Sequence, residues 1–273
     1  MDGSMDKFNQ EIREIMRPFF SVIVCTYNRI DLIGRALNSL QQQTEQDFEV
    51  IVVDDGSTDG TTPFLRFLTR NPWASSRMRL ISHKNNLGVA AAKNSGVEHA
   101  EGKYITFLDS DDQYCLSHLR SRKQQLVKDS SIEVLHGGVH VIGNPYVVNK
   151  DNSKQLIHIK ECAVGGTFFI RRDVFGKIGT FHDLSYAEDA QFLARAIDSG
   201  MKVERATWPS YYYYRNVPNQ LTAIYSKSRT LVDKAASAGQ QIIRRWNDTL
   251  NLTYRTIKHA RKSYEINLNC DTL

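Results

Sequence analysis

Apolar and polar positions in the first 112 residues follow two alternating patterns, one typical of strands and one typical of helices. Nearly continuous apolar runs at 19–25, 48–53 and 104–108, and a shorter one at 78–82, predict four strands. Apolar residues with helical spacing predict three helices between these strands. The first follows Asp31, which we expect to cap it, the second has Pro63 in its first turn, and the third covers 88–100. This order predicts right-handed βαβ crossovers and an α/β fold with a doubly wound, mostly parallel sheet.

The pattern changes after residue 112. A helix near 116–127 comes first, and the later segments are predicted strands at 132–136, 139–142, 155–159, 167–170 and 201–206, helices from 173 and 186, and an aromatic run at 211–214. From about 226 to 263 the chain is predicted to form a basic amphipathic helix. We therefore divide the chain into an N-terminal arm (1–18), one domain (19–222) with halves at 19–112 and 113–222, and a C-terminal helical extension (223–273).

Polar clusters follow three of the predicted parallel strands. They are Thr26-Tyr27-Asn28, Asp54-Asp55 and the acidic run 109–112. Because ligands of doubly wound sheets bind beyond the carboxyl ends of the strands, we expect these clusters at one rim. Tyr27 offers a stacking surface for a nucleotide base, and Thr26, Asn28 and Asp55 offer hydrogen-bond partners. The alternative for Asp54-Asp55 is an ordinary acidic turn.

The acidic run suggests a metal site. Asp109 and Asp111 are two residues apart, so in an extended chain both side chains lie on one face, where their charges repel. Mg²⁺ or Mn²⁺ removes that cost and typically takes one or two carboxylates together with diphosphate oxygens. Taken alone, a solvated acidic turn after the strand is an equally good interpretation.

Composition excludes several classes of protein. The hydrophobic share of 41% and the charged share of 24% are ordinary for a soluble globular chain, and no apolar run approaches a membrane span. Residues 1–17 lack the apolar core of a secretory signal, and the four cysteines form no C-x-x-C pair, so we expect reduced thiols in a cytoplasmic protein. The net charge of +5 favours anionic ligands only weakly, and we expect no nucleic-acid partner. The chain has neither a Walker loop nor G-x-G-x-x-G, which argues against an ATPase or a dehydrogenase.

Four motifs together resemble those of the GT-A fold family 2 glycosyltransferases. In the family's order they are 21–28 (SVIVCTYN), 53–59 (VDDGSTD), Leu87-Gly88 with 93–96 (KNSG), and 107–112 (FLDSDD); Glu188-Asp189 is similar to the family's later acidic pair. The resemblance covers roughly residues 19–222. It implies a GT-A, Rossmann-like sheet with mixed strands on the acceptor side, and a nucleotide-sugar-dependent transferase.

The resemblance implies roles in donor binding. Asp55 would accept a hydrogen bond from the imide N–H of the base, which fits uracil, so the donor would be a UDP-sugar. Asp111 would bind the Mn²⁺ or Mg²⁺ directly, and Asp109 would contact ribose or metal. Lys93, at a position where the family often has arginine, would pair with phosphate as a point charge. The alternative for Lys93 is a solvated helix lysine.

The resemblance also assigns the catalytic base. A carboxylate at a helix start beside the sugar can deprotonate an acceptor hydroxyl. Asp189 matches the family's base and Glu188 its neighbour; the alternative is a pair that only stabilises a helix N-terminus. Attack from the face opposite the leaving group would invert the anomeric centre. The family often has a His shortly after a Tyr-Arg pair, whereas none follows Tyr214-Arg215 here, so either Arg215 compensates or loop closure over the metal is weaker.

The sequence thus predicts a metal-dependent inverting glycosyltransferase that uses a UDP-sugar and a saccharide or lipid-linked acceptor. Two alternatives stay open: an aspartate-nucleophile phosphatase built on Asp109, and a non-catalytic sugar-nucleotide binding protein. The C-terminal helix offers three further roles, which are peripheral contact at the inner face of the membrane, a homodimer interface, and ordinary packing.

Overall fold

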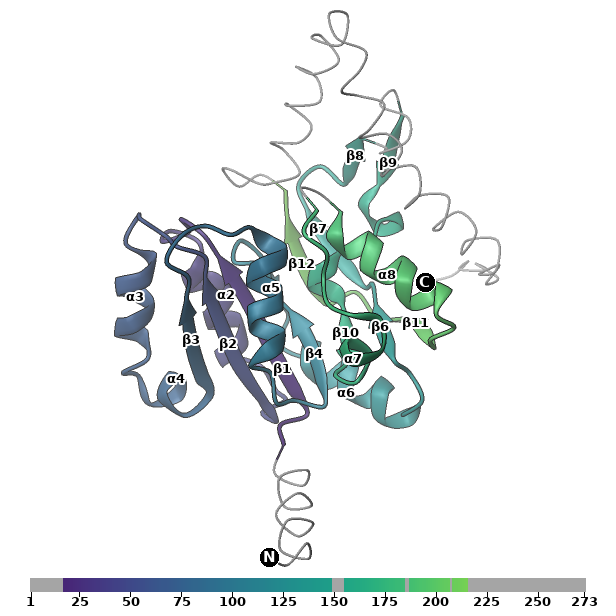
Figure 1. Ribbon diagram of the computed structural model, residues 1–273, viewed down its shortest axis with the longest axis horizontal. Coiled ribbons are helices and arrows are strands. Elements are labelled where there is room, and N and C mark those ends of the chain that lie inside the picture. Colours follow the sequence, from purple (N-terminus) through teal and green to yellow (C-terminus); the bar gives the residue numbers. More distant parts are fainter. Residues whose placement is uncertain (1–16, 149–154, 185–186, 207, 216–273) are drawn as a thin grey trace, which may run out of the picture.

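The computed structural model describes residues 17–148, 155–184, 187–206 and 208–215 (Figure 1). The first half contains β1 (Phe20–Thr26), α2 (Ile33–Gln41), β2 (Phe48–Asp54), α3 (Thr61–Leu68), α4 (Pro72–Arg77), β3 (Met78–Ser82), α5 (Val89–Glu98) and β4 (Tyr104–Phe107). The second half contains β5 (Gln113–Tyr114), α6 (His118–Lys128), β6 (Val134–His136), β7 (Val139–Ile142), β8 (Tyr146–Val148), β9 (Leu156–His158), the 3₁₀ turns η1 (Ile159–Glu161) and η2 (Gly165–Thr167), β10 (Phe169–Arg171), α7 (Val174–Ile178), α8 (Glu188–Asp198), β11 (Val203–Arg205) and β12 (Tyr211–Tyr214).

A seven-stranded sheet organises these elements in the order β11-β6-β10-β4-β1-β2-β3. β1 pairs in parallel with β2 and β4, and β2 pairs in parallel with β3. β10 lies antiparallel between β4 and β6, and β6 pairs in parallel with β11. The mostly parallel, doubly wound sheet and the mixed strands of its second half are therefore confirmed. Two small sheets, β5-β12-β7 and β8-β9, complete the second half.

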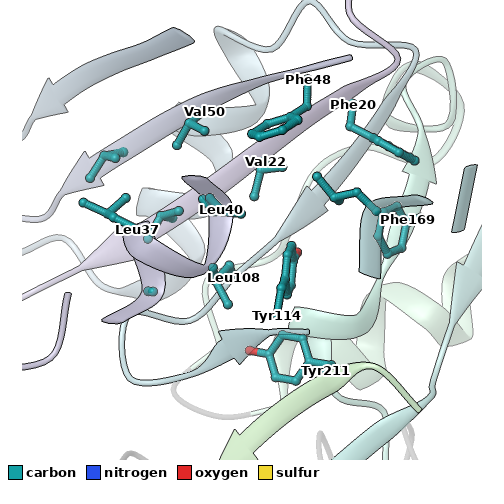
Figure 2. Close-up of a cluster of buried hydrophobic side chains, with 14 of the residues drawn as sticks. Phe20, Val22, Leu37, Leu40, Phe48, Val50, Leu108, Tyr114, Phe169 and Tyr211 are labelled. Atoms are coloured by element: carbon teal, nitrogen blue, oxygen red, sulfur yellow. The ribbon is translucent and has the colours of Figure 1, made fainter. Parts of the chain in front are cut away.

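Both faces of the sheet are covered, because alternate residues of the central strands point to opposite sides. Val22 and Val24 of β1 belong to a core that includes side chains of α2, α3, α4 and α6, whereas Ile23 belongs to a second core with α5, α7 and α8. Figure 2 shows part of the first core, where Tyr114 and Tyr211 lie near Leu108. On the other face, a Cβ at Gly96 of α5 would lie 2.5 Å from the Ile23 side chain, so only glycine allows this close approach.

The helix starts differ in part from the prediction. Asp31 does not cap α2: the helix begins from a turn in which the Arg29 carbonyl accepts from the N–H groups of Leu32 and Ile33, and Leu32 takes the capping position without a side-chain bond. The capping position is therefore one residue later than the prediction placed it. The short helix α4 was not predicted, although Pro72 at its first position and the Asn71 cap are ordinary start signals.

Several predictions fall partly or wholly outside the described residues. The N-terminal arm (1–18) is described only from residue 17, and the helix predicted at 226–263 is not described, so the domain boundaries and the three roles of that helix stay predictions. Cys25, Cys115 and Cys162 are free thiols, as expected, and Cys270 is not among the described residues. In the part of the chain that is described, none of the helices is long and apolar enough to cross a bilayer.

Candidate functional site

The three predicted polar clusters do meet at one rim of the sheet. Thr26 at the end of β1 is paired with Asp54 at the end of β2, and the Asp55 N–H donates to the Thr26 carbonyl at 2.9 Å. The Leu108 N–H donates to the Ile23 carbonyl at 2.9 Å, which brings the acidic run beside β1. The register of the parallel strands therefore brings the three clusters to one rim.

The loop after β1 presents one open aromatic face and one buried hydroxyl. Tyr27 is 43% exposed, so it is open to stacking. The Thr26 hydroxyl is buried and has no hydrogen-bond partner among the described residues. Asn28 adopts a left-handed conformation (φ 52°), which asparagine tolerates, and its side-chain oxygen accepts from the Thr58 N–H at 2.8 Å. The loop is thus held against the segment that follows β2.

Asp55 is the centre of a second set of hydrogen bonds. Its carboxylate accepts from the N–H groups of Leu87 at 2.9 Å and Gly88 at 2.8 Å, and from the His83 ring at 2.6 Å. The other His83 ring nitrogen lies 2.9 Å from the Ser95 hydroxyl on α5. Since a carboxylate offers about four acceptor positions, one stays for a ligand. His83 was missed by the sequence reasoning, although it directly follows β3 at the same rim and the rule applied to the other strands would have found it.

The acidic run forms a turn, so the prediction of an extended chain at Asp109 and Asp111 was wrong. The Asp112 N–H donates back to the Asp109 carbonyl at 2.9 Å because β4 already ends at Phe107. Desolvation raises the pKa of Asp109 to about 7, and the nearby carboxylates add to this while Lys93 opposes it. This excess of negative charge, offered by oxygen ligands, fits a hard divalent cation.

Asp112 has a structural role that the sequence did not reveal. It is fully buried, and its carboxylate accepts from the Tyr211 hydroxyl at 2.7 Å and the Tyr214 N–H at 2.8 Å. Burial raises the pKa of Asp112 well above its usual range. Arg35 of α2 holds the same turn from the other side: its guanidinium donates to the Asp111 carbonyl and lies 3.7 Å from the centre of the Tyr214 ring. The acidic turn is therefore fastened to β12 and α2.

Lys93 joins the two halves of the domain. Its ammonium donates to Glu188 at 2.9 Å and to Asp189 at 2.5 Å, and the residue is 3% exposed. The alternative of a solvated helix lysine is therefore wrong. The pKa of Lys93 is raised: desolvation is the largest effect and opposes the shift, but the two carboxylates outweigh it. Burial raises the pKa of Asp189, and Lys93 partly offsets this shift.

Asp189 is the more accessible member of the acidic pair, since its side chain is 21% exposed and that of Glu188 only 10%. Its second oxygen accepts from the Gly165 N–H at 3.1 Å. A Cβ at Gly165 would lie 2.2 Å from that carboxylate, and one at Gly166 would lie 2.2 Å from the Tyr211 hydroxyl. Ala187, just before the pair, has a positive φ of 67°, a conformation that costs alanine about 1–2 kcal/mol. Sequence analysis did not identify Gly165 and Gly166 as site residues, because it treated 167–170 as an isolated strand.

Among the described residues, no three His, Cys, Asp or Glu side chains are placed to hold a metal by themselves. A Mg²⁺ or Mn²⁺ site typically takes one or two carboxylates and completes its shell with substrate oxygens. Asp109 and Asp111 are the residues that would hold the ion.

Comparisons with known proteins all find glycosyltransferases. The family model described as glycosyl transferase family 2 matches residues 21–179. The chain is 28% identical over 227 residues to the uncharacterized glycosyltransferase EpsJ of Bacillus subtilis, covering 77% of this chain and 64% of that protein. It is 31% identical over 149 residues to the UDP-Glc:alpha-D-GlcNAc-diphosphoundecaprenol beta-1,3-glucosyltransferase WfgD of Escherichia coli, covering 53% of this chain and 56% of that one.

A solved structure resembles the fold. It is residues 1–349 of S. aureus TarS in complex with UDP-GlcNAc, with a TM-score of 0.62 and 27% identity over 75% of this chain and 60% of that one. The chain thus spans somewhat less than two thirds of the length of these three proteins.

Proposed function

This chain belongs to the family 2 glycosyltransferases, and we propose that it is a metal-dependent, inverting enzyme that transfers a sugar from a UDP-sugar to a hydroxyl of a saccharide or lipid-linked acceptor. The observation that carries the proposal is the contact of Lys93 with Glu188 and Asp189, which brings a carboxylate from the second half beside the nucleotide motifs of the first. The family match favours glycosyl transfer over the phosphatase alternative. A cytoplasmic location is part of the proposal.

Donor binding would use the rim of the first half. Tyr27 stacks on the base, the buried Thr26 hydroxyl gains a partner, and the remaining acceptor position of Asp55 receives the uracil imide N–H. A divalent ion held by Asp109 and Asp111 would act as a Lewis acid on the leaving diphosphate. The names of TarS in complex with UDP-GlcNAc and of WfgD, which specifies UDP-Glc, support uridine donors.

Transfer would be a single displacement. The acceptor oxygen forms a bond to the anomeric carbon as the bond from that carbon to the diphosphate oxygen breaks, and the hydroxyl proton passes to Asp189. Burial raises the pKa of Asp189, which makes its carboxylate a better proton acceptor than an ordinary aspartate. Glu188 is more buried and shares Lys93, so its role is to hold the lysine and thereby orient Asp189.

Calorimetry tests donor binding. We expect UDP to bind more tightly with Mn²⁺ or Mg²⁺ than in EDTA, and more tightly than GDP under the same conditions. Equal affinity in EDTA would contradict the metal, and tighter GDP binding would contradict the uracil contact.

The base is tested by one matched pair of variants on α8. Asp189→Asn should abolish sugar transfer while leaving UDP binding nearly unchanged, because its contribution belongs to the transition state. Asp198→Asn makes the same change at the exposed far end of the helix and should keep full turnover. Wild-type turnover in Asp189→Asn would refute the assignment.

A further inference from the structure

A cavity of about 200 Å³ lies beyond the carboxyl ends of β6 and β11, and neither the sequence motifs nor the proposed donor site uses it. Its lining includes Gly137, Gly138, Lys160, Val164, Thr167 and Arg205. Because β10 is antiparallel to both β4 and β6, β6 runs in the same direction as β4. The cavity therefore opens at the same edge of the sheet as the acidic turn, but in the second half.

The lining of the cavity is basic. Lys160 and Arg205 contribute positive charge, and no carboxylate lines it or forms an ion pair with either residue in the described ranges. The Arg205 guanidinium donates to the Lys160 carbonyl at 2.9 Å, which holds the two residues together. The neighbouring His136 adds no charge, because desolvation and Arg205 lower its pKa to about 4.

A third cation, Arg122, lies behind the lining of the cavity. Arg122 of α6 is 1% exposed, and it donates to the carbonyls of Gly137 at 3.3 Å and Trp208 at 2.9 Å. Within the described ranges its Nε has no hydrogen-bond partner and no carboxylate pairs with it. Desolvation lowers the pKa of Arg122 to about 10, so it stays charged at neutral pH. A buried cation without a counter-charge is costly, and an anion in the cavity would reduce that cost.

The lining of the cavity is also next in the chain to the residue that holds Asp189, the proposed catalytic base. Val164 lines the cavity, and the next residue, Gly165, donates its N–H to Asp189. Consecutive Cα atoms are about 3.8 Å apart, so the wall of the cavity is adjacent along the chain to the residue that holds Asp189. The volume equals that of about seven water molecules and is below the roughly 300 Å³ of pockets that enclose a whole small ligand. It suits one compact anionic group of a larger molecule.

We propose that this cavity binds a phosphoryl group of the acceptor and so selects phosphorylated saccharide acceptors, whose hydroxyl then reaches Asp189. The inference rests on the proposed function and names its acceptor class. Arg and Lys together, with a third cation behind them, are the side chains that recognise phosphate. The phosphoryl group is either the diphosphate of a lipid-linked sugar or a phosphate within a soluble glycan.

The first test uses inorganic phosphate as the probe, titrated into the full chain saturated with UDP and Mg²⁺ so that the donor site is filled. We expect salt-sensitive binding that weakens about tenfold or more in the Lys160→Gln/Arg205→Gln double variant. Lys128→Gln, at the exposed end of α6 that leads into the start of β6, is the control and should bind as the wild type does. UDP affinity should be equal in all three proteins.

Two failures are distinguishable. UDP binding without phosphate binding, or equal phosphate binding by the double variant, overturns the cavity proposal and leaves the proposed function intact. Absence of UDP binding overturns the proposed function and, with it, this inference.

The second test measures transfer to three acceptors that share one sugar: a lipid-linked diphosphate, a water-soluble phosphorylated glycan, and a phosphate-free saccharide. Arg205→Gln should raise KM for a phosphorylated acceptor about tenfold with kcat nearly unchanged, and the acceptor that shows the effect identifies the source of the phosphate. An equal rise in KM for the phosphate-free saccharide would mean that Arg205 has only a structural role, which overturns the proposal.

Discussion

Gly165→Ala is expected to displace the proposed base without disturbing donor binding. The added Cβ would lie 2.2 Å from the Asp189 carboxylate, whereas an ordinary contact begins at 3.4 Å. The difference, 3.4 − 2.2 = 1.2 Å, is the distance by which the carboxylate or the turn must move. A displacement of about 1 Å at a reacting group costs on the order of 100-fold in rate. We therefore expect kcat to fall about 100-fold, with UDP affinity within about twofold of the wild type because the nucleotide motifs are untouched.

Turnover with a UDP-sugar, calorimetry with UDP, and thermal unfolding together separate displacement from misfolding. Overpacking of this kind costs about 1–3 kcal/mol of stability, so a folded variant with a modestly lower Tm is expected. Gly176→Ala, in α7, is the control, because beyond its chain neighbours and its own helix backbone no heavy atom of the structure lies within 4 Å of its Cβ position. A folded Gly165→Ala protein with wild-type kcat would refute the argument that Asp189 must keep this position.

Three further predictions concern stability. Lys93→Met leaves the acidic pair without its buried partner and should lower the free energy of unfolding by about 3–5 kcal/mol in urea denaturation; a loss below about 1 kcal/mol would contradict the burial of the ion pair. Tyr211→Phe removes a donor from the buried Asp112 and should cost about 1–3 kcal/mol by the same measurement, whereas an unchanged midpoint would count against this bond. The pKa of His136 is about 4 in the folded chain, below its ordinary 6.5. Between these pH values the unfolded chain binds a proton at His136 and the folded chain does not. The free energy of unfolding should therefore fall by at most about 3 kcal/mol as the pH drops from 6.5 to 4. Unfolding measured across that range should show a smaller loss in His136→Gln, and identical slopes would refute this assignment.

The strands and their rim could be predicted because the signals are local. A continuous apolar run such as 48–53 is typical of a parallel strand that is buried on both faces. The position of Asp54 and Asp55 at the ligand-binding rim then follows from the direction of that strand. Sequence analysis left an extended acidic run and an acidic turn both open for residues 109–112, since nothing in those residues says that β4 ends at Phe107. The structure shows the turn.

Side chains that support the site from other elements were beyond the reach of the sequence. Arg35 occupies a polar position of an amphipathic helix, and only the tertiary fold brings it to the Asp111 carbonyl, 76 residues away. Gly165 and Gly166 matter through the close approach of Asp189 and Tyr211, which come from later elements. The pairing of Lys93 with phosphate stays a prediction. The partners that the structure shows, Glu188 and Asp189, lie about a hundred residues downstream, so the burial of Lys93 could not be foreseen.

The antiparallel strand β10 has a consequence for the order of folding. The parallel unit β1 to β4 is built from neighbouring segments, but β4 pairs on its other side with β10, which brings Thr106 opposite Phe169. Until the ribosome has delivered residue 171, β4 is therefore an edge strand of four buried residues with unpaired backbone groups, and such edges invite association between chains. A shortened chain that ends at residue 112 would carry all the nucleotide motifs of the first half and yet expose this edge, so it would tend to aggregate instead of serving as a separate nucleotide-binding module.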